Sequence, residues 1–262
     1  MTFIAPNKKH VVIGMLHLPP LPGSPLYAGD WQKSLKLVLE DAKALTDGGV
    51  DALMMENFGD VPFYPDRVSS DVVALMTTVA VEVRRASPLP LGINVLRNDG
   101  LSALSIALAS EASFIRVNVL SGARVTDQGV IQGIAHELLR ARADVGAKHI
   151  KILADVDVKH SAPLAPRPIE DEVEDTVRRG LADAVIVSGA GTGKSVDSSK
   201  LAKVSKVAGV PVILGSGVNE ANVAQFKELA WGFIVGTSLK FDGDVKRPVD
   251  LQRVRQFMKI LA

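Results

Sequence analysis

Short runs of apolar and β-branched residues recur along the chain, and each is followed by a stretch with helical periodicity. The apolar runs begin at Val11, Ala52, Pro90, Phe114, Ile150, Asp183, Pro211 and Gly232. Between them, apolar residues return every three or four positions, as in residues 35–45. A spacing of roughly 20–40 residues between the runs fits strand–helix units. The pattern predicts a single (β/α)8 TIM barrel over residues 1–262. An open doubly wound sheet is the alternative, because strand runs alone do not show closure.

Polar residues stand where several of these predicted strands end. Side chains alternate between the two faces of a strand, so polar residues two positions apart should point together into the barrel. In a TIM barrel the active site lies at the carboxyl ends of the strands. The candidate catalytic residues on this basis are His17, Glu56, Asn94, Arg116, Asn118, Asp155 and Lys159.

The fifth predicted strand contributes most to this polar group, since the same alternation places Asp155, Asp157 and Lys159 on one face. A lysine beside two aspartates should have a high pKa, which argues against Lys159 as a Schiff-base nucleophile. We expect Asp155 to be held ready for a ligand, so that Asp155→Asn leaves folding intact and abolishes ligand binding or turnover. The alternative is a polar plug whose members satisfy one another.

Glycine-rich loops follow the last three predicted strands. In TIM barrels, the loops after the seventh and eighth strands commonly bind phosphate through backbone N–H groups. The candidate phosphate-binding residues are Gly189, Gly191, Gly193, Gly215, Ser216, Gly217, Gly236 and Thr237. Asn219 is the predicted N-cap of the helix that follows the seventh strand. The alternative is that these glycines only turn the chain from strand to helix.

The segment "SGAGTGKS" resembles the phosphate-binding loop of nucleotide hydrolases because Gly193, Lys194 and Ser195 match its ending. Ser188, however, stands where that motif needs its first glycine. The next helix is predicted after Asp197, a good N-cap, and not at Ser195. We therefore interpret residues 188–195 as a sixth loop that closes over a ligand through Thr192, Lys194 or Ser195.

The amino-acid composition excludes several classes of ligand and of catalytic group. A net charge of +1 with interleaved charges gives no basic surface for nucleic acid. The chain has no cysteine, which excludes thiol nucleophiles and cysteine-ligated metals and favours the cytoplasm. Glu56, Asp155 and His17 are the natural metal set, but no regular spacing supports them, so neither a metal nor a cofactor is predicted. No apolar run reaches the roughly 18 residues of a membrane span, so any membrane contact would be peripheral.

Several longer motifs carry a family resemblance. They are "GMLHLPPLPGSP", "MMENFGDVPF", "GINVLRNDG", "FIRVNVLSGARVTDQG", "ADVDVKHSAPL" and "GSGVNEANV" followed by "GFIVGTSLKFDGD". Together they resemble the BtpA/SgcQ family over nearly the whole chain. The resemblance implies a TIM barrel related to a cyanobacterial factor needed to accumulate photosystem I, with relatives in non-photosynthetic bacteria and archaea. Because those relatives lack photosystems, the resemblance favours a general role with a small molecule.

Two functions compete. The first is an aldolase, isomerase or epimerase acting on a phosphorylated metabolite. Asp155 or Glu56 would transfer the proton, and Lys159, Arg116 or Asn118 would neutralise the developing oxyanion. The second is a non-catalytic assembly factor whose client binds the apolar loops "LPPLPGSPLY" and "VPFYP". We prefer to interpret these loops as a packed cap on the barrel. A homo-oligomer is a further expectation that no sequence feature tests.

Overall fold

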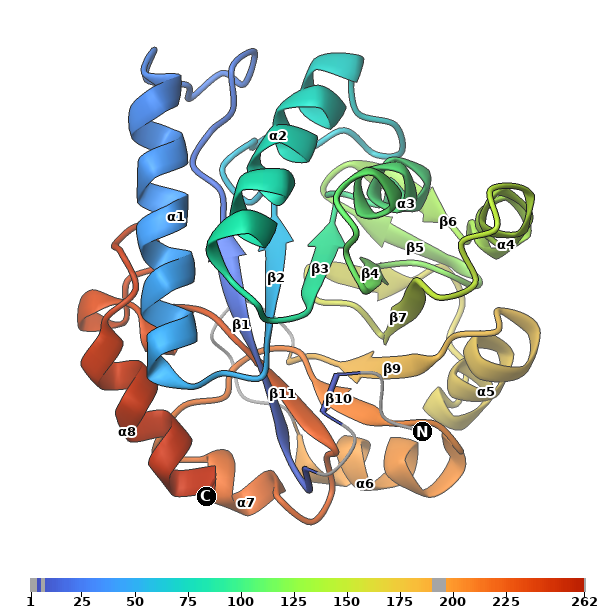
Figure 1. The fold of residues 1–262 in the computed structure, drawn as a ribbon. Coiled ribbons are helices and arrows are strands. Elements are labelled where there is room, and N and C mark those ends of the chain that lie inside the picture. The colour runs from blue at the N-terminus through green and yellow to red at the C-terminus, as the bar shows by residue number, and fades with distance from the viewer. Residues whose placement is uncertain (1–3, 6–7, 190–196, 262) are drawn as a thin grey trace.

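Eight parallel strands close into a barrel, and helices surround it (Figure 1). The computed structural model describes residues 4–5, 8–189 and 197–261. In order around the barrel, its strands are β1 (Val11–His17), β11 (Gly232–Val235), β10 (Val212–Leu214), β9 (Ala184–Val187), β7 (Lys151–Val156), β4 (Phe114–Val117), β3 (Leu91–Asn94) and β2 (Ala52–Glu56). Strand β1 pairs with both β2 and β11, which closes the sheet. The predicted TIM barrel is therefore confirmed, with all eight apolar runs as its strands.

Both faces of the barrel strands are apolar, which explains why the strands appear in the sequence as unbroken apolar runs. On β1, Val11, Ile13 and Met15 pack inside the barrel, whereas Val12 and Leu16 pack outward against the helices. The other strands alternate in the same way. Gly92 on β3 leaves room for the ring of Phe114, because a Cβ at residue 92 would lie 2.0 Å from that ring.

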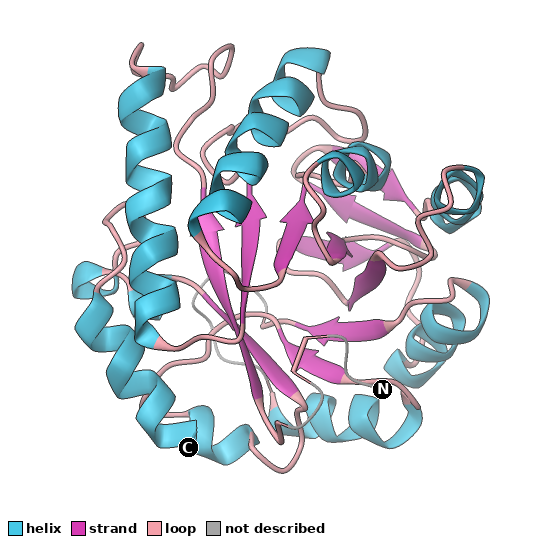
Figure 2. Cartoon of the chain, viewed as in Figure 1, coloured by secondary structure: helices cyan, strands magenta, loops and turns pink. Residues whose placement is uncertain are grey.

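Helices cover the outside of the barrel (Figure 2). They are α1 (Trp31–Gly48), α2 (Ser70–Ala86), α3 (Gly100–Ala109), α4 (Ala135–Asp144), α5 (Ile169–Glu174), α6 (Ser198–Val207), α7 (Val223–Phe226) and α8 (Leu251–Leu261). Asp197 caps α6 as predicted, since its carboxylate accepts a hydrogen bond from the backbone N–H of Ser199 at 2.8 Å. In the described part of the chain, no helix has the length and apolar character needed to cross a membrane.

A small antiparallel sheet stands apart from the barrel and was not predicted. It consists of β6 (Gly129–Gln132), β5 (Ala123–Thr126) and β8 (Ser161–Pro163), in that order. Residues 121–133 show no strand pattern in the sequence, because these short strands are mostly exposed and carry little apolar periodicity. Their pairing with β8, far along the chain, is a tertiary contact that local patterns do not contain.

Candidate active site

Each barrel strand ends in a polar residue or a glycine on its inward face. We call these positions the mouth layer. Each lies two residues after the preceding inward-facing residue of its strand. The mouth layer consists of His17, Glu56, Asn94, Arg116, Asp155, Ser188, Gly215 and Gly236. The strand register places the neighbours His17, Glu56, Asn94 and Arg116 side by side. The expected convergence of polar groups at the carboxyl ends of the strands is therefore present.

Arg116 and Asp155 form a buried, bidentate ion pair at the centre of this layer. Arg116 Nε and Nη2 each donate to the Asp155 carboxylate at 2.8 Å. The Asp155 side chain is 0% exposed and that of Arg116 is 2% exposed. Burial lowers the pKa of the Arg116 guanidinium, but the charge and hydrogen bonds of Asp155 outweigh burial and raise that pKa above its usual value. The pair fixes the guanidinium in one orientation.

Two further donors complete the bonding of Asp155. Asn118 Nδ2 donates to it at 2.9 Å, and the hydroxyl of Ser188 donates at 3.3 Å. Both carboxylate oxygens therefore accept two hydrogen bonds. Asp155 and Asn118 do not line the adjacent cavity, whereas Arg116 does. This bonding favours Asp155 as the residue that positions Arg116; its catalytic role stays a prediction.

A cavity of about 310 Å³ opens at this end of the barrel. Side chains of His17, Glu56, Arg116 and Lys159 line one part of it. The loops after β10 and β11, residues 215–219 and 236–238, line another part together with Arg253 from α8. Predicted catalytic residues and predicted phosphate loops thus share one cavity. Asn94 lies outside its lining; its side-chain Nδ2 donates to the carbonyl oxygen of Arg116 at 3.2 Å.

Three buried polar atoms at the mouth have no hydrogen-bond partner in the described part of the chain. They are the side-chain oxygens of Asn94 and Asn118 and Nδ1 of His17. Buried polar groups are normally satisfied by protein, water or ligand. Three unpaired atoms at one place argue against a plug whose members satisfy one another, but of these three residues only His17 lines the cavity.

The carbonyl oxygens of the two glycine loops are bonded within the protein. Asn222 Nδ2 donates to the carbonyl oxygen of Gly217 at 2.8 Å, and the Ser238 hydroxyl donates to that of Val218 at 2.9 Å. Arg253 Nη1 donates to the carbonyl oxygen of Ser238 at 3.1 Å. Among the described hydrogen bonds, the N–H groups of Gly217 and Val218 have no acceptor. Both residues line the cavity, so these N–H groups are available to a ligand there.

Close packing also requires two of these glycines. A Cβ on Gly215 would lie 2.3 Å from Ile186, and one on Gly236 would lie 2.6 Å from the His17 ring. Gly217 has a φ of +70°, which favours glycine. Gly189 donates through its N–H to the Ser216 hydroxyl at 3.0 Å, which joins the sixth and seventh loops. Thr237 lines the cavity. Gly191 and Gly193, with Thr192, Lys194 and Ser195, lie outside the described residues.

The helix predicted to begin directly after Asn219 begins three residues later than expected, because α7 covers Val223–Phe226. Asn219 nevertheless caps the preceding turn, since its side-chain oxygen accepts hydrogen bonds from the N–H groups of Ala221 and Asn222. This turn holds the loop that starts at Gly215.

Asp157 departs from its expected place. Strand β7 ends at Val156, and Asp157 adopts a φ of +54°, so its carboxylate leaves the barrel and pairs with Arg124 and Lys200. Alternation along a strand does not hold beyond the end of that strand. The expectation that Asp157 shares the inward face is therefore wrong.

Lys159 does reach the cavity, but its environment differs from the expected one. Burial lowers the pKa of Lys159 below its usual value, and the guanidinium of Arg116 acts in the same direction, while Glu56 opposes both. The prediction of a high pKa is wrong, because one neighbouring aspartate turns away and the other is bonded to Arg116.

His17 lies at the wall of the cavity and packs against Phe58, with ring centroids 4.7 Å apart. Burial lowers its pKa to about 3, and the positive charges of Lys240, Lys159 and Arg116 add to the shift. The imidazole is therefore neutral at physiological pH. Within the described residues, no group of three His, Asp or Glu side chains is arranged to hold a metal ion.

Two cations of the mouth were missed by sequence reasoning. Arg253 belongs to α8 and lies 15 residues beyond Ser238, the loop residue to which it donates. Arg97 follows β3, is buried, and donates through Nη2 to the carbonyl oxygen of Lys159 at 2.6 Å. Arg97 lies within "GINVLRNDG", a motif singled out by the family resemblance, whereas no local signal distinguishes Arg253.

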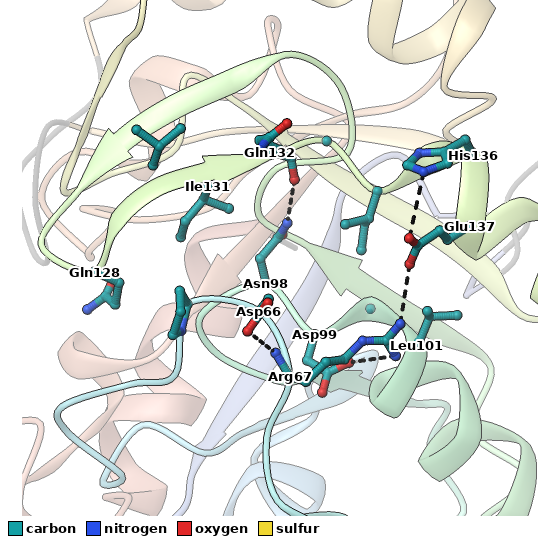
Figure 3. A pocket seen from close by; sticks show the side chains of 15 residues that line it. Asp66, Arg67, Asn98, Asp99, Leu101, Gln128, Ile131, Gln132, His136 and Glu137 are labelled. Atoms are coloured by element: carbon teal, nitrogen blue, oxygen red, sulfur yellow. Dashed lines mark hydrogen bonds and ion pairs between the residues drawn. The ribbon is translucent and has the colours of Figure 1, made fainter.

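A second, larger cavity of about 510 Å³ lies between α3, α4 and the β5–β6 hairpin (Figure 3). Its charged side chains pair with one another. Arg67 contacts Glu137 at 3.2 Å, and Asp99 caps α3 by accepting from the N–H of Ser102 at 2.9 Å. Asn98 donates to the carbonyl oxygen of Gln132 at 3.2 Å. These contacts are those of a structural junction, so the smaller cavity is the better candidate for an active site.

Comparison with known proteins gives family and fold. The model of the BtpA family matches residues 8–262. An uncharacterised protein of Thermococcus kodakarensis is 51% identical over 249 residues, which cover 95% of this chain and 94% of that protein. The photosystem I biogenesis protein BtpA of Synechocystis is 44% identical over 252 residues, covering 96% and 88%.

Among solved structures, N-(5'-phosphoribosyl)anthranilate isomerase from Pyrococcus furiosus superposes with a TM-score of 0.59 at 13% identity, covering 96% of this chain and 98% of the isomerase. At that identity the likeness shows the fold alone. The sequence matches extend over nearly all of the chain and include the motifs at the barrel mouth. The chain therefore belongs to the BtpA family.

Proposed function

We propose that the protein binds a phosphorylated small molecule in the cavity at the barrel mouth and catalyses a proton-transfer reaction on it, of the aldolase, isomerase or epimerase type. One observation carries the proposal: the two glycine loops, Arg253, Glu56 and Lys159 all line a single cavity. Phosphate binding at glycine loops and acid–base chemistry at strand ends are the usual division of labour in this fold.

The phosphate would bind at the loops that contain Gly217 and Thr237. Backbone N–H groups there would donate to its oxygens, and the Arg253 guanidinium would add a charged donor. Arg253 forms no ion pair with a carboxylate among the residues that the structure describes, so its charge is available to an anion. Arg253 and Arg116 both place guanidinium groups on the cavity, which favours an anionic ligand.

Glu56 is the residue best placed for proton transfer. It lines the cavity, it is 3% exposed, and within the described chain its carboxylate makes no hydrogen bond or ion pair. Asp155, the other candidate, uses both carboxylate oxygens to hold Arg116 and Asn118. Arg116 would stabilise the oxyanion that develops when a proton leaves the carbon beside a carbonyl.

Thermal denaturation with inorganic phosphate and glycerol 3-phosphate tests the binding step. A ligand at about one hundred times its Kd stabilises by about 2.7 kcal/mol, which raises the Tm by roughly 5–11 °C for a chain of this size. Arg253→Met should remove most of the shift, whereas Arg255→Met, on the exposed side of the same helix, should keep it. Equal shifts in the two variants would place phosphate elsewhere.

One observation supports the second candidate, a non-catalytic assembly factor. An apolar cavity of about 470 Å³ lies beside the mouth, and both proline-containing loops line it. Leu18 and Leu21 are buried in the cap, but Leu26 is 61% exposed and Val61 is 40% exposed. A client protein could bind there. A screen of phosphorylated metabolites that finds no stabilising ligand would favour this function over the enzyme.

A further inference from the structure

Among the described residues, no carboxylate contacts the amino group of Lys159 at the barrel mouth. Arg116 is paired with Asp155, and Lys240 with Asp41 at 3.0 Å. Lys159, by contrast, forms no ion pair with any residue that the structure describes, although its side chain lines the same cavity. A buried ammonium without a partner is costly, so the neutral amine is favoured at this position.

The backbone holds this lysine at the cavity. Strand β7 ends two residues before Val158, and Asp157 and His160 both adopt positive φ angles, which bend the chain over the mouth. Arg97 fixes the bend by donating to the carbonyl oxygen of Lys159. Ion pairs of Asp157 with Arg124 and Lys200 hold the other side of the bend.

We propose that Lys159 is an amine nucleophile that forms a Schiff base with the carbonyl carbon of a phosphorylated aldehyde or ketone bound in this cavity. The inference rests on the proposed function for its phosphate anchor and names the substrate class: a phosphate ester that carries a carbonyl group. The distinguishing geometry is an unpaired amine and an unpaired carboxylate, Glu56, on one cavity.

The chemistry balances without a cofactor. The neutral amine attacks the carbonyl carbon, a C–N bond forms, and the electron pair of the C=O bond moves to oxygen, which takes a proton. The nitrogen then loses a proton, and the carbinolamine loses its hydroxyl with a further proton as water, leaving an iminium ion. Glu56 is the group available to give and take these protons. The iminium withdraws electrons from an adjacent C–H or C–C bond, as isomerases and aldolases require.

The electrostatics of the cavity agree with this role. Burial lowers the pKa of Lys159. The negative charges of Glu56 and Asp155 oppose this shift, and the positive charges of Arg116 and Arg97 add to it. His17, neutral at physiological pH, adds no further charge beside the amine.

Borohydride trapping of the whole protein tests the inference. The probes are pyridoxal 5'-phosphate and glyceraldehyde 3-phosphate, compared with pyridoxal and glyceraldehyde. Peptide mass spectrometry should find the reduced adduct on Lys159 in stoichiometric amount. Phosphorylated probes should label at concentrations at least about tenfold lower, because a charged hydrogen bond to phosphate contributes about 1.5–3 kcal/mol. Inorganic phosphate should compete.

Variants make the assignment specific. Lys159→Arg keeps a long basic side chain, cannot form the Schiff base, and should lose the adduct, whereas Lys36→Arg, exposed on α1, should keep it. Peptide mapping of the parent protein assigns the lysine even if Lys159→Arg does not fold. Adducts spread over surface lysines, or absent from Lys159 while phosphate esters still stabilise the protein, would overturn the Schiff base and leave phosphate binding standing. No stabilisation by any phosphate ester would overturn both.

Discussion

Replacing Asp155 by asparagine separates a structural from a catalytic role for the charge at the barrel mouth. The sequence alone led us to expect unchanged folding, with Asp155 waiting for a ligand. The geometry reverses this expectation, because the carboxylate accepts two hydrogen bonds from Arg116 and one each from Asn118 and Ser188. Asp155→Asn should therefore destabilise the protein.

The expected loss of unfolding free energy follows from the burial of the pair and from the number of hydrogen bonds that Asp155 accepts. An asparagine amide can replace either carboxylate oxygen, but in both orientations its NH2 group faces one N–H of Arg116, so one hydrogen bond becomes a contact between donors. The guanidinium also loses its counter-charge in a site where both side chains are at most 2% exposed. Breaking a buried pair in this way costs about 3–5 kcal/mol. The Tm should fall by roughly 6–20 °C.

Thermal and urea denaturation at pH 7 would measure the loss. Asp144→Asn is a matched control, since Asp144 is exposed at the end of α4 and makes no hydrogen bond or ion pair within the described chain. The double variant Arg116→Met with Asp155→Asn removes both charges and should recover part of the loss, with a coupling energy of about 2–3 kcal/mol. If Asp155→Asn stays within about 0.5 kcal/mol of the parent protein, the pair is not structural and the original expectation stands.

Three further predictions concern other positions. His17 has a pKa of about 3 in the folded protein and 6.5 in the unfolded chain. Its contribution to stability is therefore complete above pH 6.5 and is lost as the pH falls toward 3. The difference in unfolding free energy between the parent protein and His17→Gln should accordingly shrink between pH 7 and pH 4. Arg253→Met should weaken binding of inorganic phosphate about tenfold or more, and calorimetry that finds equal affinities would refute its role as an anchor. Gly236→Ala should lower the free energy of unfolding by about 1–3 kcal/mol, because the new Cβ would lie 2.6 Å from the His17 ring; a crystal structure with that ring unmoved would contradict the reasoning.

Local sequence patterns are enough to predict the barrel and the residues at its mouth. Strands buried on both faces must be apolar at every position, so they stand out as short runs, and the helices between them show their own period. Residues two apart on a strand share a face, so Glu56 faces inward like Met54, and Arg116 faces inward like Phe114. Asp197 was identified as a cap because capping depends only on residues within one turn.

The interactions of these groups, in contrast, depend on contacts between distant parts of the chain. Whether Asp155 waits for a ligand or holds Arg116 depends on hydrogen bonds between residues 39 apart. Lys159 has a lowered pKa because burial and distant charges act on it, and neither can be read from its neighbours in the chain. Arg253 reaches the loop after β11 because α8 packs against the turn Thr237–Leu239 in the folded protein. Local patterns record which face a side chain takes, whereas pairing, desolvation and access arise from contacts that the chain makes only when folded.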